Sequence, residues 1–202
     1  MPPEDEIRAW TCQVDDLTYT CSTDPRLIQL DAVNAAFSSD MVYWAKPLAP
    51  KALKRCIEMS LCFGLYVQEG GEQAKVEDAA SLPGPTSNQK MIGLSRLITD
   101  YVTFGYLTDV YILGAHQGKG LGRWMMGCVD EVLASWPSLR RCMLFTRDAS
   151  AVRLYAETLG MTDVRETPSA SLFLLERHAA LVQGRAYKAR QRGEAEGLED
   201  GR

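Results

Sequence analysis

The stretch DVYILGAHQGKGLGRWMMG, residues 109–127, joins a strand-like apolar run to a helical pattern through a glycine-rich loop. The glycines at 118, 120 and 122 remove side chains where the helix would begin. The first N–H groups of a helix bind anions, and glycine lets an anion come close to the backbone. The loop therefore indicates either an anion-binding site or a tight turn between a strand and a helix.

The spacing of the glycines does not fit two common phosphate-binding motifs. In the GxGxxG fingerprint of dinucleotide-binding folds, the third glycine would fall on Arg123. A P-loop needs four residues between its first glycine and the Gly-Lys pair, followed by Ser or Thr. Here three residues separate Gly114 from Gly118, and Gly120 stands in the hydroxyl position. Sites for NAD and for ATP are both disfavoured.

Gln117, Gly120 and Gly122 fit the pattern Gln-x-x-Gly-x-Gly. At this point the sequence resembles the GCN5-related N-acetyltransferase (GNAT) family, whose Gln/Arg-x-x-Gly-x-Gly/Ala motif binds the pyrophosphate of acetyl-coenzyme A. A second stretch, DASAVRLYAETLGM at residues 148–161, is similar to another motif of that family, with Asp148 where Asn is common and Met161 where Phe is common. Gly114 stands where the family usually has proline. The resemblance covers roughly residues 91–161.

The resemblance implies an α/β (α+β) fold, in which helices flank a mixed, mostly antiparallel central sheet and a central βαβ unit binds the cofactor. It also implies how acetyl-coenzyme A lies. Backbone groups of Ile112 and Leu113 would pair with the pantetheine arm, and the loop would hold the pyrophosphate. The cofactor-binding residues expected from the resemblance are Ile112, Leu113, Gln117, Gly118, Lys119, Gly120, Leu121, Gly122, Arg123 and Asp148. Lys119 and Arg123 either add charge toward the phosphates or are ordinary solvated residues.

Tyr155 occupies the position of the family's general acid, where its phenol would protonate the departing thiolate of coenzyme A. A phenol stays protonated at neutral pH, as this role requires. The alternative is a half-buried aromatic residue on an amphipathic helix.

Asp109 is the second candidate catalytic residue, because it is the only carboxylate in the strand before the loop. It would accept the amine proton or anchor a cationic substrate, or else be a buried structural acid satisfied by backbone groups or by an arginine. Simple alternation places it on the face of Leu107, opposite Tyr106, Thr108 and Val110, unless a bulge intervenes. Tyr106 and Thr108 are candidate substrate-binding residues. Asp100 and Tyr101 are weaker candidates for the acceptor pocket, and His116 is interpreted as a turn residue.

The remaining patterns predict one domain over residues 1–182 and a polar tail over 183–202. Helices are expected where apolar residues recur at three- and four-residue spacing, at residues 24–37, 50–60, 121–136 and 150–160. Strands are expected in aromatic and β-branched runs bounded by turn residues, at 19–21, 61–68, 90–100, 104–113, 140–146 and 171–177. Polar residues 72–89 indicate a loop.

The composition bounds the class of protein. Hydrophobic residues make up 46% and charged residues 24%, as in soluble globular domains. The net charge of -4 disfavours nucleic acid as a partner. Without a long apolar run or a basic leader, we expect a cytoplasmic protein that does not interact with membranes. Six widely spaced cysteines and two histidines predict reduced thiols and no metal site.

The sequence thus predicts an N-acetyltransferase that transfers the acetyl group of acetyl-coenzyme A to a primary amine of a small molecule, by direct attack in a ternary complex. One alternative is acetylation of a protein N-terminus or lysine, and another is a coenzyme A-binding sensor without activity. A homodimer is left open.

Overall fold

The computed structural model describes residue 3 and residues 6–68 and 89–166, in two units. The first unit ends at Met161, and the described part of the second contains one short 3-10 turn, Val164–Glu166. The expected strand at 171–177, the tail at 183–202 and nearly all of the loop at 72–89 lie outside the described residues. Among the described helices, none is long and apolar enough to cross a membrane.

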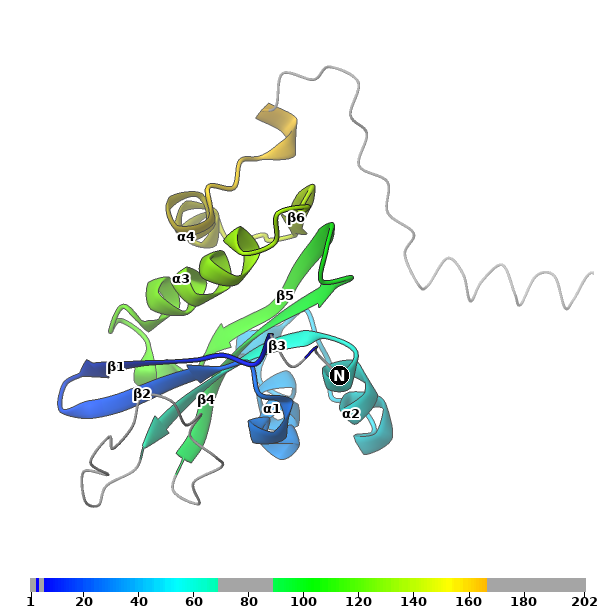
Figure 1. Cartoon of the computed structure of the whole chain (residues 1–202). Helices are drawn as coiled ribbons and strands as arrows, with labels where there is room; N and C mark the ends of the chain where they lie inside the picture. Colours follow the sequence, from blue (N-terminus) through cyan, green and yellow to red (C-terminus); the bar gives the residue numbers. More distant parts are fainter. Residues whose placement is uncertain (1–2, 4–5, 69–88, 167–202) are drawn as a thin grey trace, which may run out of the picture. The chain divides into compact units, whose positions relative to one another are not determined.

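The described part of the first unit is built on one mixed sheet (Figure 1). Its strands, in spatial as well as chain order, are β1 (Ala9–Val14), β2 (Leu17–Ser22), β3 (Leu61–Gln68), β4 (Gln89–Thr99), β5 (Phe104–Ile112) and β6 (Arg141–Leu144). Neighbouring strands from β1 to β5 are antiparallel, whereas β5 and β6 are parallel. The parallel pair requires a crossover connection, which α3 (Leu121–Ala134) supplies. The predicted mostly antiparallel sheet with a central βαβ unit is confirmed.

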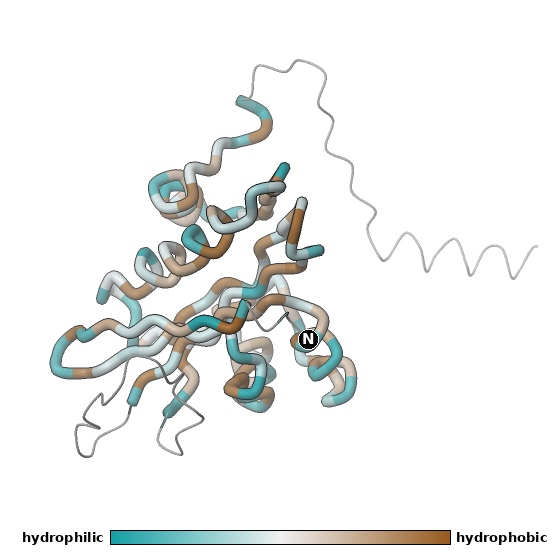
Figure 2. The backbone as a smooth tube through the Cα atoms, in the orientation of Figure 1, coloured by the Kyte–Doolittle hydropathy of each residue, from teal (hydrophilic) through white to brown (hydrophobic). Residues whose placement is uncertain are grey.

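Helices cover both faces of the sheet. On one face lie α1 (Leu30–Phe37) and α2 (Pro50–Glu58), and on the other lie α3 and α4 (Ala149–Leu159) (Figure 1). The first two helices bury an apolar cluster that includes Val33, Phe37, Leu53, Ile57, Leu94 and Tyr111. The last two bury another, which includes Phe63, Leu97, Leu107, Met125, Val129, Val132 and Tyr155. Both clusters follow the strands through the middle of the unit, where apolar residues concentrate (Figure 2).

The helix signals in the sequence are confirmed with one correction. Pro50 is the first residue of α2, and Gly160 ends α4 at φ 61°. The helix expected at 24–37 is broken, however: Asp24 caps a 3-10 turn, Pro25–Leu27, and the chain then extends before α1. The break exists because the Gln29 side chain donates to the Gln89 carbonyl at 2.7 Å and accepts from the Met91 N–H at 3.1 Å.

The N-terminal strand β1 was not predicted. It forms a hairpin with β2 through Asp15 and Asp16, whose φ values are 51° and 60°. Two successive residues at positive φ are typical of the type I′ turn, which joins two-residue hairpins. Aspartate adopts this conformation more readily than most residues. Asp15 and Asp16, which lie between two runs that contain Thr and Cys, were therefore the sequence signal for this hairpin.

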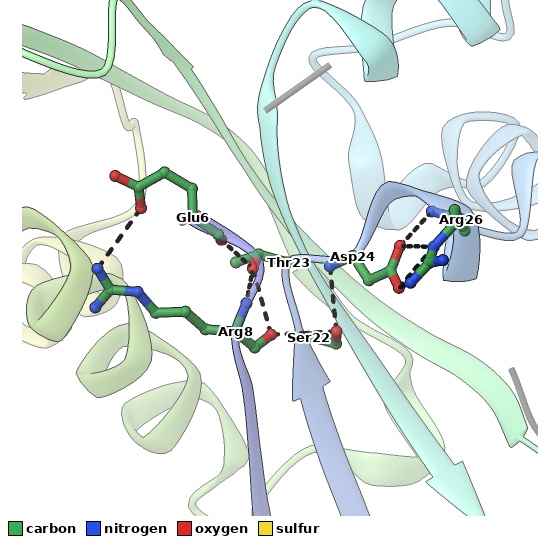
Figure 3. A network of polar contacts seen from close by, with 6 residues as sticks. All are labelled: Glu6, Arg8, Ser22, Thr23, Asp24 and Arg26. Carbon is green, nitrogen blue, oxygen red and sulfur yellow. Dashed lines mark hydrogen bonds and ion pairs between the residues drawn. The ribbon is translucent and has the colours of Figure 1, made fainter. Parts of the chain in front are cut away.

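Polar contacts connect the N-terminal segment to the end of β2 (Figure 3). Thr23 Oγ1 accepts from the Arg8 N–H at 2.7 Å and donates to the Glu6 carbonyl at 2.6 Å. Glu6 in turn accepts from the indole N–H of Trp136 at 2.6 Å. At the other end of this network, the Arg26 guanidinium pairs with the buried Asp24 carboxylate. The hairpin is thereby fixed against the end of α3.

Candidate functional site

The parallel strands β5 and β6 separate at the centre of the unit. They are paired from Phe104 and Arg141 to Leu107 and Leu144, and β5 then continues to Ile112 paired only with β4. Beyond Leu107, no described strand pairs with this edge of β5. In sheets with parallel strands, ligands bind outside the carboxyl ends of the strands, where neighbouring strands diverge. The candidate site therefore lies along the last residues of β5.

The backbone of Ile112 faces this open edge. Its partner on β4 is Gly93, and the neighbouring Leu113 N–H donates to the Ile92 carbonyl at 2.8 Å. This arrangement makes Ile112 and Gly93 a non-hydrogen-bonded pair, so the N–H and C=O of Ile112 point away from β4. The Ile112 carbonyl accepts from Gln117 Nε2 at 2.7 Å. The Leu113 carbonyl accepts from the His116 N–H at 2.8 Å, so both backbone groups of Leu113 have partners within the protein.

The glycine loop ends at an uncapped helix start. Gly118 and Gly120 both have φ of 77°, a conformation that side-chain-bearing residues rarely adopt. Gly120 is the N-cap of α3 and offers no side chain to the first N–H groups of the helix. These N–H groups belong to Leu121, Gly122 and Arg123, the residues expected to hold the pyrophosphate. The geometry suits an anion that approaches the helix axis.

Two basic side chains lie at this loop, and both have carboxylate partners. Lys119 Nζ lies 2.9 Å from Asp15 at the tip of the β1–β2 hairpin, and this contact raises the pKa of the lysine. Arg123, in the first turn of α3, pairs with Glu157 of α4. Both contacts are partly or fully exposed, so the carboxylates compete with a bound anion only weakly.

Tyr155 is buried, with 9% of its surface exposed, and belongs to the cluster beneath α3 and α4. Burial raises the pKa of its phenol to about 12, and the negative charge of Asp148 adds to this effect. The phenol is therefore protonated throughout the physiological range, as a proton donor must be. Asp148, expected at the cofactor, caps α4 by accepting from the Ser150 N–H at 2.8 Å, and its pKa is lowered by its hydrogen bonds to Ser150.

Asp109 lies at a β-bulge, which corrects the simple alternation expected for β5. The register shifts so that Arg96 pairs with Thr108 but Leu94 pairs with Tyr111, and Asp109 has φ of 51°. Asp109 consequently leaves the face of Leu107, and Oδ2 accepts from Arg96 Nε at 2.7 Å. Of the roles considered for this carboxylate, its observed contacts are those of a buried acid paired with an arginine.

The bulge also changes the faces of the residues that follow. Leu107 and Val110 both contact the cluster under α3, so Val110 does not share the face of Thr108 as alternation would require. Tyr111 belongs instead to the cluster under α1 and α2, and Ile112 to the cluster under α3. The inserted residue therefore shifts the alternation of the last three residues of β5 by one.

The expected substrate-binding residues precede the bulge. Thr108 Oγ1 lies 3.4 Å from Asp109 Oδ1, and the Tyr106 ring lies 5.7 Å from the ring of Phe145, which follows β6. Both side chains are half-buried. Asp100 and Tyr101 lie in the turn before β5, at the opposite end of the strand from the open edge. Asp100 accepts from three backbone N–H groups of that turn and therefore has a structural role there.

Two contributors were missed in the sequence. Arg96 of β4 is a lone cation in the apolar run MIGLSRLIT, and such a charge needs a partner as much as Asp109 does. This signal was available. Met41, in the 3-10 turn Asp40–Val42, contacts Gln117 through its sulfur at 3.8 Å from Nε2. No local pattern indicates that contact, because 76 residues separate the two side chains.

Known proteins resemble this chain over both sequence and fold. A family model described as "Acetyltransferase (GNAT) family" matches residues 53–161. A Gibberella zeae protein named "Putative acetyltransferase FG08082" is 50% identical over 153 residues, which make up 73% of this chain and 81% of that protein. The crystal structure of a GNAT-family protein from Xanthomonas campestris pv. campestris superposes with a TM-score of 0.58 at 29% identity, covering 83% of this chain and 96% of that one.

The chain therefore belongs to the GNAT family of acetyltransferases. This confirms the predicted fold and the predicted class of enzyme, an acyltransferase. The cofactor of this family is acetyl-coenzyme A.

Proposed function

We propose that this protein transfers the acetyl group of acetyl-coenzyme A to the primary amine of a small molecule. The observation that carries the proposal is the continuous path from the open edge of β5 to the start of α3. The Ile112 backbone points to that edge, and the uncapped N–H groups after Gly120 begin nine residues later, at Leu121. A pantetheine arm alongside β5 would end with its pyrophosphate at this helix start.

The residues of the loop have separate roles in this proposal. Gly118 and Gly120 supply the left-handed conformations that turn the chain into α3. Gln117 links the loop to β5 through the Ile112 carbonyl, which fixes the distance between the pantetheine and pyrophosphate sites. Lys119 and Arg123 add positive charge nearby, and each exchanges part of its contact with a carboxylate for the phosphates.

The reaction follows from what the buried groups can do. The amine attacks the thioester carbon directly, and a tetrahedral oxyanion forms. At the bulge, Asp109 and Val110 lie opposite one residue of β4, so an N–H of this pair is left out of the ladder. That N–H is our candidate oxyanion donor. The C–S bond then breaks, and the Tyr155 phenol donates its proton to the coenzyme A thiolate. The tyrosine recovers a proton from the acetylated ammonium through solvent.

The proposed amine substrate is narrow around its amino group. The side chains of β5 next to the bulge, Thr108 and Tyr111, are half-buried or buried, and Asp109 is 7% exposed. A primary amine on an unbranched carbon is the acceptor that needs the least space at such a position. An amine of this shape is found in polyamines and arylalkylamines, and the lysine side chain of a peptide is the competing class.

The test is release of the coenzyme A thiol by the purified protein in the presence of acetyl-coenzyme A and a panel of amines. The panel contains a polyamine, an arylalkylamine, an amino sugar, free amino acids and peptides with a lysine or a free N-terminus. We expect acetylation of a small amine with saturation by both substrates. Acetylation of peptides alone would assign the protein to the competing class. Binding of acetyl-coenzyme A without turnover on any member would favour the sensor.

A further inference from the structure

The partly buried side chain of Arg96 connects three elements around the bulge. Its Nε donates to Asp109 Oδ2 on β5 at 2.7 Å, and its Nη1 donates to Ser60 Oγ at 3.1 Å. Ser60 follows α2, and its hydroxyl donates to the Cys56 carbonyl of that helix at 2.9 Å. The side chains of Arg96 and Asp109 are only 13% and 8% exposed. The guanidinium is therefore a fixed bridge between the end of α2 and the middle of β5.

Asp109 has a backbone conformation that needs such support. Its φ of 51° lies in the left-handed region, where residues with side chains are found mainly when surrounding contacts hold them. The two residues Asp109 and Val110 lie opposite the single residue Ser95 of β4. Because the bulge residue lacks a full place in the ladder, the ion pair with Arg96 is its main fixed contact across the strands.

The bulge lies where the chemistry would occur. The pairing of β5 with β6 ends at Leu107, two residues before Asp109, and the Ile112 backbone points to the open edge three residues after it. A change in the bulge would therefore move the backbone groups that receive the cofactor. Displacement of reacting groups by about 1 Å is enough to cost roughly 100-fold in rate.

We propose that Arg96 is a positioning residue for acetyl transfer, which acts through Asp109 by holding the bulge of β5, and that Asp109 does not accept the amine proton. This inference rests on the proposed function. The reason is electrostatic: protonation of Asp109, which is buried, would leave the partly buried guanidinium of Arg96 without its counter-charge. Asp109 thus serves as the counter-ion of Arg96, and another group or water accepts the amine proton.

The experiment compares the full-length wild-type protein with Asp109→Asn, Arg96→Gln, Arg96→Lys and the double variant Arg96→Gln/Asp109→Asn. Binding of acetyl-coenzyme A is measured by calorimetry, and kcat and KM are measured against pH with an amine accepted in the panel. Arg26→Gln is the matched control, because Arg26 also bonds a buried carboxylate, that of Asp24, with an N–O distance of 2.6 Å (Figure 3). The control should leave kcat unchanged.

We expect Asp109→Asn to lower kcat about 10-fold without changing the shape of the pH profile, because its carboxamide oxygen still accepts from Arg96. Arg96→Gln should lower kcat about 100-fold, since it releases the bulge and leaves a buried carboxylate unpaired. Arg96→Lys should restore part of that loss. The double variant should be more active than the product of the two single losses predicts, because it removes both charges together.

Three results would overturn the inference. The first is loss of the acidic limb of the pH profile in Asp109→Asn, which would make Asp109 the base. The second is strictly multiplicative losses in the double variant, and the third is a wild-type kcat in Arg96→Gln. If Arg96→Gln does not fold, the pH profile of Asp109→Asn and the kcat of Arg96→Lys still decide between the two roles. If the wild-type protein acetylates no amine at all, the proposed function itself is refuted.

Discussion

Replacing Gly120 and Gly122 by alanine, one at a time, should have opposite effects on stability. Gly120 has φ of 77°, and an added Cβ would meet no atom within 4 Å. Its replacement therefore costs only backbone strain. Gly122 lies inside α3 with an ordinary helical φ, and its added Cβ would meet Ile112 Cδ1 at 3.8 Å, a normal van der Waals contact. Its replacement removes the helix penalty of glycine without a clash.

The magnitudes follow from these positions. A residue with a side chain in the left-handed region costs about 1–2 kcal/mol, so Gly120→Ala should lower the free energy of unfolding by that amount. Alanine in place of a helical glycine contributes up to about 1 kcal/mol, so Gly122→Ala should raise it. For a chain of this length, about 1 kcal/mol corresponds to a change in Tm of roughly 2–4 °C. If the loop of Gly120→Ala instead relaxes to another conformation, binding must restore the left-handed conformation at the same cost. The affinity for acetyl-coenzyme A should then fall by about 5- to 30-fold.

Thermal unfolding and calorimetric titration with acetyl-coenzyme A measure both effects. Gly120→Ala should lose stability, affinity or both, whereas Gly122→Ala should gain stability and keep its affinity. The contrast would explain why the family's motif permits alanine at the position of Gly122 but not at that of Gly120. The reasoning is refuted if Gly120→Ala binds acetyl-coenzyme A and unfolds as the wild-type protein does, or if Gly122→Ala alone loses binding.

Three further predictions concern titratable groups. Tyr155→Phe should lower kcat by about 10²- to 10⁴-fold and leave the Kd for acetyl-coenzyme A within about 2-fold; an unchanged kcat would exclude Tyr155 as the acid. Asp15→Asn removes the partner of Lys119 and should tighten acetyl-coenzyme A binding a few-fold at low salt and not at high salt. If the variant and the wild-type protein have equal affinities at every salt concentration, Lys119 does not bind the phosphates. The hydrogen bond from Arg26 lowers the pKa of Asp24, so its stabilisation is complete above about pH 4 and is lost as the pH falls through the lowered value. Arg26→Gln should therefore reduce the dependence of unfolding on acid, and identical acid transitions would contradict this.

The sequence predicted most elements because their signals are local. Pro50 and Gly160 mark ends of helices, and the apolar spacing in α3 is that of a helix packed on one side. These features act within one or two turns of chain, so neighbouring residues suffice to show them. The candidate cofactor loop belongs to the same category, since positive φ at Gly118 and Gly120 and the start of α3 depend on adjacent residues.

The features that were missed depend on distant partners. The break before α1 requires the contacts of Gln29 with Gln89 and Met91, which are 60 and 62 residues away in the chain. The contact between Gln117 and Met41 depends likewise on how the connection between α1 and α2 packs against β5. Periodicity does not contain such information. Strand β1 is different, because Asp15 and Asp16 offered a local turn signal that aspartate carries more weakly than Asn-Gly does.

The bulge at Asp109 shows how electrostatics decides between two strand geometries. Regular alternation would direct the carboxylate to the face of Leu107, into an apolar cluster that includes Val129 and Val132. An unpaired carboxylate there would cost several kcal/mol, roughly, whereas a left-handed aspartate costs about 1–2 kcal/mol. The chain adopts the less costly conformation, and Asp109 reaches Arg96. The same inserted residue places the Ile112 side chain in the core beneath α3, beside Gly122 in the first turn of that helix. One ion pair between β4 and β5 thus determines how the strand approaches the cofactor loop, and its two charges were visible in the sequence as isolated residues in apolar runs.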